Sequence, residues 1–218
     1  FAHIDTPQPT SAGDTAMRWL CALLFAACAG LNTTACAQDK DPALIRTLTG
    51  HSSAVNSVAV TPDGQTIVSG SWDNTIKVWR LSDGQLLRTV SGHTGSVRNV
   101  AVTPDGQTIV SGSSDNTIKV WRLSDGLLLR TLPVPGTGDA GHTSAVYSVA
   151  VTPDGQTIVS GSVNTIKVWR LSDGQLLRTL TGHRSSVTSV AVTPDGRAIV
   201  SGSYDRTIKV WRLSDGQL

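Results

Sequence analysis

The chain has 218 residues, a formal net charge of +2 and 39% hydrophobic residues, so it holds one or two folded domains and lacks the basic surplus of a general nucleic-acid binder. All 16 acidic residues are aspartate and there are 21 glycines; without glutamate, a good helix former, and with so much glycine, helical fold classes are disfavoured. The hydrophobic content is ordinary for a globular protein and argues against disorder over the whole chain.

The first 37 residues are expected to precede the folded protein. Residues 1–16 come before Met17, the only methionine, and are predicted to be an upstream segment without a structural role. Residues 17–37 (MRWLCALLFAACAGLNTTACA) combine a short positive start, an apolar stretch and small residues before Gln38. This is the anatomy of a secretory signal peptide. We therefore expect cleavage after Ala37 and export to the periplasm or the extracellular space.

Two alternatives for this leader stay open. The apolar stretch could be a buried helix, although it is too short to span a bilayer, and a lipoprotein-type signal would retain Cys36 as a lipid-anchored residue. Cleavage after Ala37 would remove all three cysteines, Cys21, Cys28 and Cys36. It would also remove the chemistry that depends on them: disulfides, thiolate catalysis and cysteine-ligated metals. We expect no transmembrane span in the mature chain and a polar linker at residues 38–43.

From residue 44 the chain repeats a unit of about 42 residues four times. Gly-His recurs at residues 50, 92, 141 and 182, T-P-D-G begins at 61, 103, 152 and 193, and I-K-V-W ends at 79, 121, 169 and 211. A repeat of this length, written in short runs rich in Val, Ile and Thr, predicts a β-propeller or a β-rich array. The strands expected in the first unit, with turns between them, are residues 44–48, 55–60, 66–71 and 75–79. Four strands per unit make one propeller blade.

Together the motifs Gly-His, Ser-Gly-Ser-x-Asp and Ile-Lys-Val-Trp closely resemble those of the WD-repeat β-propeller family, in its bacterial, highly repetitive type. The resemblance covers residues 44–218 and implies an all-β propeller of four-stranded antiparallel blades. It also implies that the outer strand of each repeat crosses to the neighbouring blade, and that the protein is a non-catalytic platform for macromolecular assembly. One departure is the dipeptide that names the family, which is Trp-Arg in every unit of this chain.

The family has a structural hydrogen-bond tetrad of His, Ser, Asp and Trp, and the resemblance carries it onto matching residues of each unit. Such a network satisfies an aspartate that would otherwise be buried without partners. The implied members are His51, Ser69, Asp73 and Trp79; His93, Ser111, Asp115 and Trp121; His142, Ser160 and Trp169; and His183, Ser201, Asp205 and Trp211. The third unit reads Ser162-Val163-Asn164, which is one residue short and lacks the aspartate. We predict that it forms the weakest blade.

Four units are fewer than family members most often have, and three interpretations follow. The chain could be truncated from a longer array, which is the interpretation we favour. Residues 44–48 could instead close the ring on the fourth unit, or two chains could pair into eight blades. An open arc would expose sheet edges and one blade face, which favours self-association.

The repeats leave no residues over for catalysis, so we predict that the protein is not an enzyme and has no catalytic, cofactor-binding or metal-binding residues. No carboxylate pair is available for acid–base chemistry once the turn and tetrad aspartates are assigned. The four repeat histidines occupy equivalent positions in separate blades, too far apart to share a metal ion. The recurring lysines are expected to form a solvated rim with the turn aspartates rather than a nucleic-acid-binding stripe: Lys77, Lys119, Lys167 and Lys209.

The units differ most in two columns, and these differences indicate a binding face. The first column holds Asn56, Arg98, Tyr147 and Thr188, and the second holds Trp72, Ser114, Val163 and Tyr204. Matching positions in WD-repeat proteins face the upper side, where partners usually bind. Trp, Tyr and Arg are enriched at binding hot spots. We therefore predict a protein or peptide partner, bound by Asn56, Trp72, Arg98, Tyr147 and Tyr204.

Two other interpretations of these columns remain. A small-ligand or glycan-binding propeller of the cell envelope would stack the same aromatic side chains on sugars, and neutral drift at exposed turns would need no ligand. The insertion at residues 133–140 (PVPGTGDA) is rich in Pro and Gly. It is expected to be a stiffened loop that extends the binding face or spaces two blades.

Overall fold

The computed structural model of the protein describes residues 43–133, 136, 138 and 140–217. The predicted upstream segment, signal peptide and most of the linker lie outside the described residues, as does part of the predicted loop at 133–140. All strands of the described residues lie within the unit Arg46–Leu218. Among the described residues, no helix has the length and apolar character that a membrane span requires.

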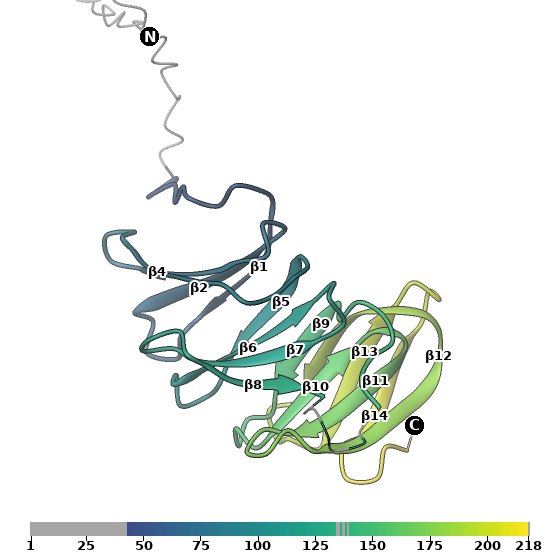
Figure 1. Cartoon of the computed structure of the whole chain (residues 1–218). Helices are drawn as coiled ribbons and strands as arrows, with labels where there is room; N and C mark the ends of the chain where they lie inside the picture. Colours follow the sequence, from purple (N-terminus) through teal and green to yellow (C-terminus); the bar gives the residue numbers. More distant parts are fainter. Residues whose placement is uncertain (1–42, 134–135, 137, 139, 218) are drawn as a thin grey trace, which may run out of the picture. The chain divides into compact units, whose positions relative to one another are not determined.

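This unit consists of antiparallel strands that pair in chain order as the blades of a propeller (Figure 1). Blade 1 is β1 (Val55–Val60), β2 (Thr66–Ser71), β3 (Ile76–Arg80) and β4 (Leu86–Val90). Blade 2 is β5 (Val97–Val102), β6 (Thr108–Ser113), β7 (Ile118–Arg122) and β8 (Leu128–Leu132). Blades 3 and 4 contain β9 (Ser148–Val151), β10 (Thr157–Gly161), β11 (Val163–Arg170), β12 (Leu176–Val192), β13 (Ala198–Ser203) and β14 (Ile208–Arg212). The predicted all-β class of four-stranded antiparallel blades is confirmed.

Blades 3 and 4 share one long strand, β12. Its first part pairs with β11 and completes blade 3, and its last part, from Val187, pairs with β13 and begins blade 4. The one-residue deletion accompanies this continuity: only Ser162 lies between β10 and β11, whereas four residues lie between β2 and β3. Strand β11 therefore begins early enough for Val163 to pair with Ser186. The corresponding segment between β4 and β5 is a loop.

The strand predictions for the first unit are confirmed for β1, β2 and, within one residue, β3. The prediction of a strand at Leu44–Leu48 is wrong. These residues form no strand, because no described residue of the chain pairs with them in a ladder. The fourth strand of blade 1 is β4, which follows the Ser82-Asp83-Gly84 turn.

The hydrophobic core lies between the blades and is built the same way three times. In the first interface, the four residues Val68, Ile76, Val78 and Val90 of blade 1 pack against Val97, Val100, Ile109 and Trp121 of blade 2. Equivalent sets of eight residues join blade 2 to blade 3 and blade 3 to blade 4. Each blade therefore needs a neighbour on both faces to bury its apolar side chains.

Polar bonds also link the first strands of successive blades. Asn99 Nδ2 donates to Ser57 Oγ at 3.0 Å, and Asn99 Oδ1 accepts the Val149 N–H at 2.9 Å. The Val190 N–H donates to Ser148 Oγ at 3.1 Å. Small polar side chains at this position thus join each blade to the next.

Candidate functional site

In blades 1, 2 and 4 the tetrad side chains form one connected network. In blade 2, His93 Nδ1 lies 2.7 Å from Asp115 Oδ2 and His93 Nε2 lies 2.8 Å from Ser111 Oγ. Trp121 Nε1 donates to the same serine oxygen at 2.8 Å. The three distances in blades 1 and 4 are identical to these. Each network ties two inner strands of a blade to the Gly-His loop before its first strand.

The tetrad aspartates are held in their charged form. Burial opposes the charge of Asp115, but hydrogen bonds from His93 and Thr117 outweigh it and keep the pKa of Asp115 well below its ordinary value. The pKa values of the aspartates in blades 1 and 4 are lowered by equivalent bonds. A charged carboxylate accepts the Nδ1–H of His93, which leaves Nε2 to accept from the Ser111 hydroxyl. Every group is paired, so the network serves the fold rather than a substrate.

In blade 3 the network stops at His142. His142 Nε2 lies 2.7 Å from Ser160 Oγ, and Trp169 Nε1 donates to that oxygen at 2.9 Å. The other ring nitrogen, Nδ1, is buried without a hydrogen-bond partner among the described residues, because the aspartate is missing. Burial and the charge of Lys167 lower the pKa of His142 to about 3. The imidazole is therefore neutral at neutral pH.

The expectation of a solvated lysine rim is wrong for Lys77 and Lys167, while Lys119 and Lys209 are half-buried. Lys77 and Lys167 are buried, and Lys77 Nζ donates to Thr89 Oγ1 on the outer strand β4 at 2.8 Å. The same bond joins Lys119 to Thr131 and Lys167 to Thr179. These three lysines lie on inner strands beside an outer strand, and each hydrogen bond links the two strands. Across the described chain, no group of three or more His, Cys, Asp or Glu side chains is arranged to hold a metal ion.

The predicted partner-binding residues all lie at one edge of the blades, the upper rim, where the first strand of a blade begins and the second ends. Asn56 and Trp72 belong to blade 1, Arg98 to blade 2, Tyr147 to blade 3 and Tyr204 to blade 4. We call these five residues the rim patch. Trp72 is 51% exposed and Tyr204 75% exposed, whereas Arg98 and Tyr147 are half-buried.

Three members of the rim patch meet at the boundary between blades 1 and 2. The guanidinium carbon of Arg98 lies 5.8 Å from the centroid of the Trp72 ring, within cation–π range. Arg98 Nε donates to Ser114 Oγ at 2.6 Å, and Asn56 Nδ2 donates to the Val97 carbonyl at 2.8 Å. Ser114 was not predicted as a site residue, although it lies in the same variable column as Trp72. It holds the arginine in place over the indole.

The two tyrosines stand apart from this group. Among the described residues, no hydrogen bond or ring contact joins Tyr147 or Tyr204 to another member of the rim patch. Their backbone N–H groups bond within their own blades, to Gly161 and Ser186 respectively. The structure therefore assembles a cluster at blades 1 and 2, with separate aromatic side chains on blades 3 and 4.

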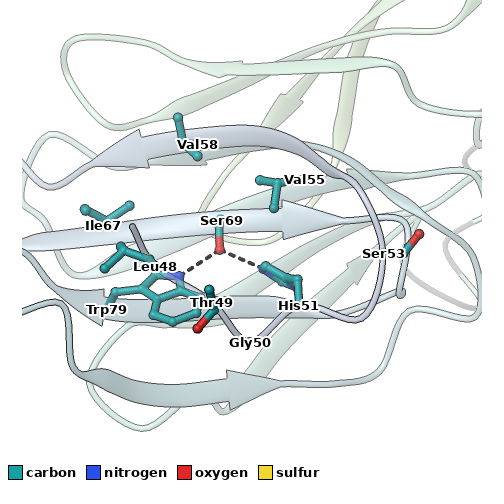
Figure 2. Close-up of a pocket in the computed structure, with 10 residues that line it drawn as sticks. All are labelled: Leu48, Thr49, Gly50, His51, Ser53, Val55, Val58, Ile67, Ser69 and Trp79. Carbon is teal, nitrogen blue, oxygen red and sulfur yellow. Dashed lines mark hydrogen bonds between the residues drawn. The ribbon is translucent and has the colours of Figure 1, made fainter. Parts of the chain in front are cut away.

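A pocket of about 350 Å³ opens on the face of blade 1. Val55, Val58, Ile67 and Trp79 supply much of its apolar wall, and the His51–Ser69–Trp79 bonds lie at its floor (Figure 2). In blade 2 the matching residues are covered by side chains of blade 1. The pocket is therefore the place that a preceding blade occupies elsewhere in the fold, and it lies apart from the rim patch.

Comparison with known proteins places these repeats in a well-defined group. The family model WD40, described as WD domain, G-beta repeat, matches residues 42–80, 84–122, 128–170 and 174–212. The solved structure of the computationally designed Ika4 protein is 39% identical, with a TM-score of 0.65, and the match covers 76% of this chain and 95% of that one.

Curated relatives match over single repeats. A segment of 40 residues is 48% identical to the small ribosomal subunit protein RACK1 of Caenorhabditis elegans, covering 18% of this chain and 12% of RACK1. Another match of 40 residues is 55% identical to ribosome assembly protein 4 of Saccharomyces cerevisiae, covering 18% of this chain and 8% of that protein. The chain thus spans only a small part of the length of these relatives.

Proposed function

This chain belongs to the WD40 repeat family, and from that premise we propose that it is a non-catalytic scaffold that binds a protein or peptide segment through the rim patch. Proteins built from such repeats generally serve as interaction scaffolds. The names of the two curated relatives, a ribosomal subunit protein and a ribosome assembly protein, fit a role in macromolecular assembly. In blades 1, 2 and 4 the tetrad histidines and aspartates bond to one another within the fold, which supports a binding role over a catalytic one.

The observation that carries this proposal is the Trp72–Arg98 cluster. A half-exposed indole is held beside a guanidinium 5.8 Å from its centroid, and Ser114 holds the arginine from the turn after β6. Large aromatic and arginine side chains that are already ordered lose little conformational entropy when a partner binds. Such a cluster suits an extended peptide that carries an acidic and an apolar side chain.

A small-ligand or glycan-binding role is the second candidate. Its support is the exposure of Trp72 and Tyr204, which a sugar could stack on. The arginine already covers part of the indole surface, which favours the peptide over the sugar. A glycan array separates the two roles: specific sugar binding that is lost in Trp72→Ala would replace the scaffold proposal with a lectin-like one.

The test of the scaffold role is a selection of peptides from a random phage-displayed library on the wild-type chain. The selected peptides are then titrated against the Trp72→Ala, Tyr147→Ala and Tyr204→Ala variants, singly and combined. We expect the triple variant to lose at least tenfold in affinity, with most of the loss in Trp72→Ala, because hot-spot aromatics cost about 2 kcal/mol or more when truncated.

Leu127→Ala is the matched control for this series. Leu127 is 51% exposed, the same fraction as Trp72, but it lies at the turn before β8, at the opposite edge of the blade. Peptides that bind the triple variant and the wild type equally well, while both fold alike by circular dichroism, would refute the rim patch as the binding face.

The proposal extends to export, for which the leader sequence at residues 17–37 is the support. Expression in a bacterial host with its own secretion machinery, followed by N-terminal sequencing of the secreted protein, tests it. We expect the mature chain to begin at Gln38. A lipidated chain that begins at Cys36 would indicate membrane anchoring instead, and a cytoplasmic chain that retains Met17 would contradict export.

A further inference from the structure

Blade 1 exposes a face that is buried in every other blade. Val58 is 65% exposed, whereas its counterpart Val100 in blade 2 is 4% exposed. Val55 is likewise exposed while Val97, Val146 and Val187 are fully buried. We call this surface, made of the exposed Val55 and Val58 together with the half-buried Ile67 and the buried Trp79, the start face. The pocket of Figure 2 lies on it.

Blade 4 exposes its other face, the one that in blades 1 to 3 packs against the next blade. Ile208 is 76% exposed, whereas Ile76, Ile118 and Ile166 are at most 1% exposed. Val210 is also exposed, although its counterparts are buried. We call this surface, made of Val200, Ile208 and Val210, the end face. Within the described residues, β14 is the edge strand of its sheet, while β3 and β7 are covered by β4 and β8.

The two faces fit each other because the molecule already contains the same contact three times. Each internal core joins four residues of one blade to four of the next, and the start and end faces carry the same residue types at the matching positions. The fourth member of the first blade in each core is an outer-strand residue, Val90 in the first interface. Its counterpart by repeat position is Leu48, which already lines the pocket on the start face.

The side chains of Arg46 and Leu48 are also placed as those of an outer strand would be. Arg46 donates to the Leu81 carbonyl of blade 1, as Arg88 of β4 donates to Leu123 of blade 2. Residues 46–48 therefore sit against blade 1 as the outer strand of a preceding blade would, although no described inner strand pairs with them. In the register of β3 with β4, Thr47 would pair with Lys209, as Thr89 pairs with Lys77.

The glycine at one repeated strand position has different surroundings in blade 4 than in the other blades. A Cβ atom added at Gly70, Gly112 or Gly161 would lie within 3.0 Å of a valine methyl group of the next blade, whereas one added at Gly202 would meet nothing within 4 Å. The three internal glycines are thus needed for close blade packing. Gly202 keeps the same residue type on a face that no described residue covers.

From these observations we propose that a second copy of this chain covers the end faces. The start face of one copy seats on the end face of the other, residues 44–48 of the first add a fourth strand to β14 of the second, and the same contact repeats at the other ends. Two copies then supply eight blades, which is within the range in which propellers close, whereas three copies would supply twelve. None of the residues of the start face or the end face belongs to the rim patch, so variants of these faces test the contact separately from the proposed scaffold function.

The test is the mass of the full 218-residue chain by light scattering after gel filtration. We expect twice the chain mass of 22.8 kDa for the wild type. Gly202→Val and Ile208→Lys should both give the single-chain mass. Neither should perturb the fold, because both positions face solvent or open space in one copy. Leu127→Lys, a substitution at an exposed position of blade 2 away from the start face and the end face, should keep the double mass.

Three results would overturn the proposal: a wild-type chain at the single mass, a ladder of larger open assemblies, or end-face variants that keep the double mass. Loss of peptide binding in the Trp72→Ala variant at the double mass would bear on the scaffold role alone. The two proposals are therefore tested independently.

An engineered disulfide tests directly which copy supplies the strand beside β14. In a chain with Cys21, Cys28 and Cys36 changed to serine, Thr47→Cys with Lys209→Cys is expected to cross-link two copies and double the mass on a non-reducing gel. The matched pair Lys77→Cys with Thr89→Cys links two strands of one blade and should leave the mass unchanged. A Thr47–Lys209 pair that oxidises without doubling the mass would show closure within one chain and overturn the second copy.

Discussion

At the residue scale, each tetrad depends on the serine hydroxyl at its centre. Ser111 Oγ lies 2.8 Å from His93 Nε2 and accepts the Trp121 indole N–H at 2.8 Å. All three side chains are buried. Because the hydroxyl both donates and accepts, no single neighbouring group can replace it, and its removal leaves two buried polar atoms without partners.

We therefore predict that Ser111→Ala lowers the free energy of unfolding by about 2–4 kcal/mol. Urea unfolding followed by tryptophan fluorescence measures this directly, since Trp121 itself reports on the network. Ser124→Ala, at an exposed turn position in the same blade, is the control and should change the free energy by less than about 0.5 kcal/mol. Equal effects of the two substitutions would contradict the role assigned to the tetrad.

The incomplete network at His142 makes stability depend on pH in a defined window. The pKa of His142 is about 3 in the folded protein, while its ordinary value is 6.5. Between these values His142 is protonated in the unfolded chain but not in the folded one, so the free energy of unfolding falls as the pH drops below about 6.5. The slope approaches about 1.4 kcal/mol per pH unit. The tetrad aspartates, whose pKa values are lowered from 3.8, add their loss only below that value.

An aspartate inserted between Val163 and Asn164 restores the sequence pattern of the other units. With a carboxylate facing Nδ1 of His142, we expect the slope of unfolding free energy between pH 6.5 and 4.5 to shrink by at least half. Urea titrations at several pH values compare the wild type with the insertion variant. An alanine inserted at the same place controls for loop length, and an equal slope in both variants would show that the carboxylate is not the cause.

At the element scale, the repeated hairpins show how one backbone position selects its residue. The turn after β2 and its counterparts place a residue in the left-handed region, and three of the four units use asparagine there: Asn74, Asn116 and Asn164. The fourth uses Arg206, at a φ of 70°. Asparagine tolerates this conformation through local hydrogen bonds, whereas arginine has no such compensation.

Arg206→Asn should therefore stabilise blade 4, by about 0.5–1 kcal/mol. The midpoint of urea unfolding is the measurement, with the slope of the transition unchanged. The reverse substitution, Asn116→Arg, should destabilise blade 2 by a similar amount. A loss of stability in Arg206→Asn would mean that the arginine side chain contributes a contact that outweighs its backbone strain.

The strands also show which elements could be predicted from the sequence and which could not. Strands β1 to β3 were predicted because turn residues bracket runs of Val, Ile and Thr, which is local information. The continuous strand β12 was not predicted, since it arises when Val163 pairs with Ser186 across a hairpin shortened by one residue. The weakness of blade 3 stays a prediction. Lysine burial was missed because an alternating strand does not show which of its faces a neighbouring strand covers.

At the scale of the whole molecule, stability and assembly are coupled. If a second copy covers the start and end faces, folding gains free energy that depends on protein concentration. We predict that the midpoint of thermal unfolding rises by several degrees when the chain concentration rises a hundredfold, whereas the midpoint of Ile208→Lys stays constant. Calorimetry at two concentrations measures both. A constant midpoint for the wild type would contradict assembly through these faces.

By itself, the sequence determined the repeat, the blade, three of the strands of its first unit and the members of the tetrads, because a motif copied at fixed spacing reports local geometry four times over. It also identified the rim positions as the columns in which the copies differ. Only the tertiary structure decided which of those residues touch: Arg98 reaches Trp72 across a blade boundary, and the tyrosines do not. It also decided that valines of identical sequence context are buried in three blades and exposed in the first. Burial depends on what lies against a side chain, and neighbouring blades are related by packing rather than by the local pattern of residues.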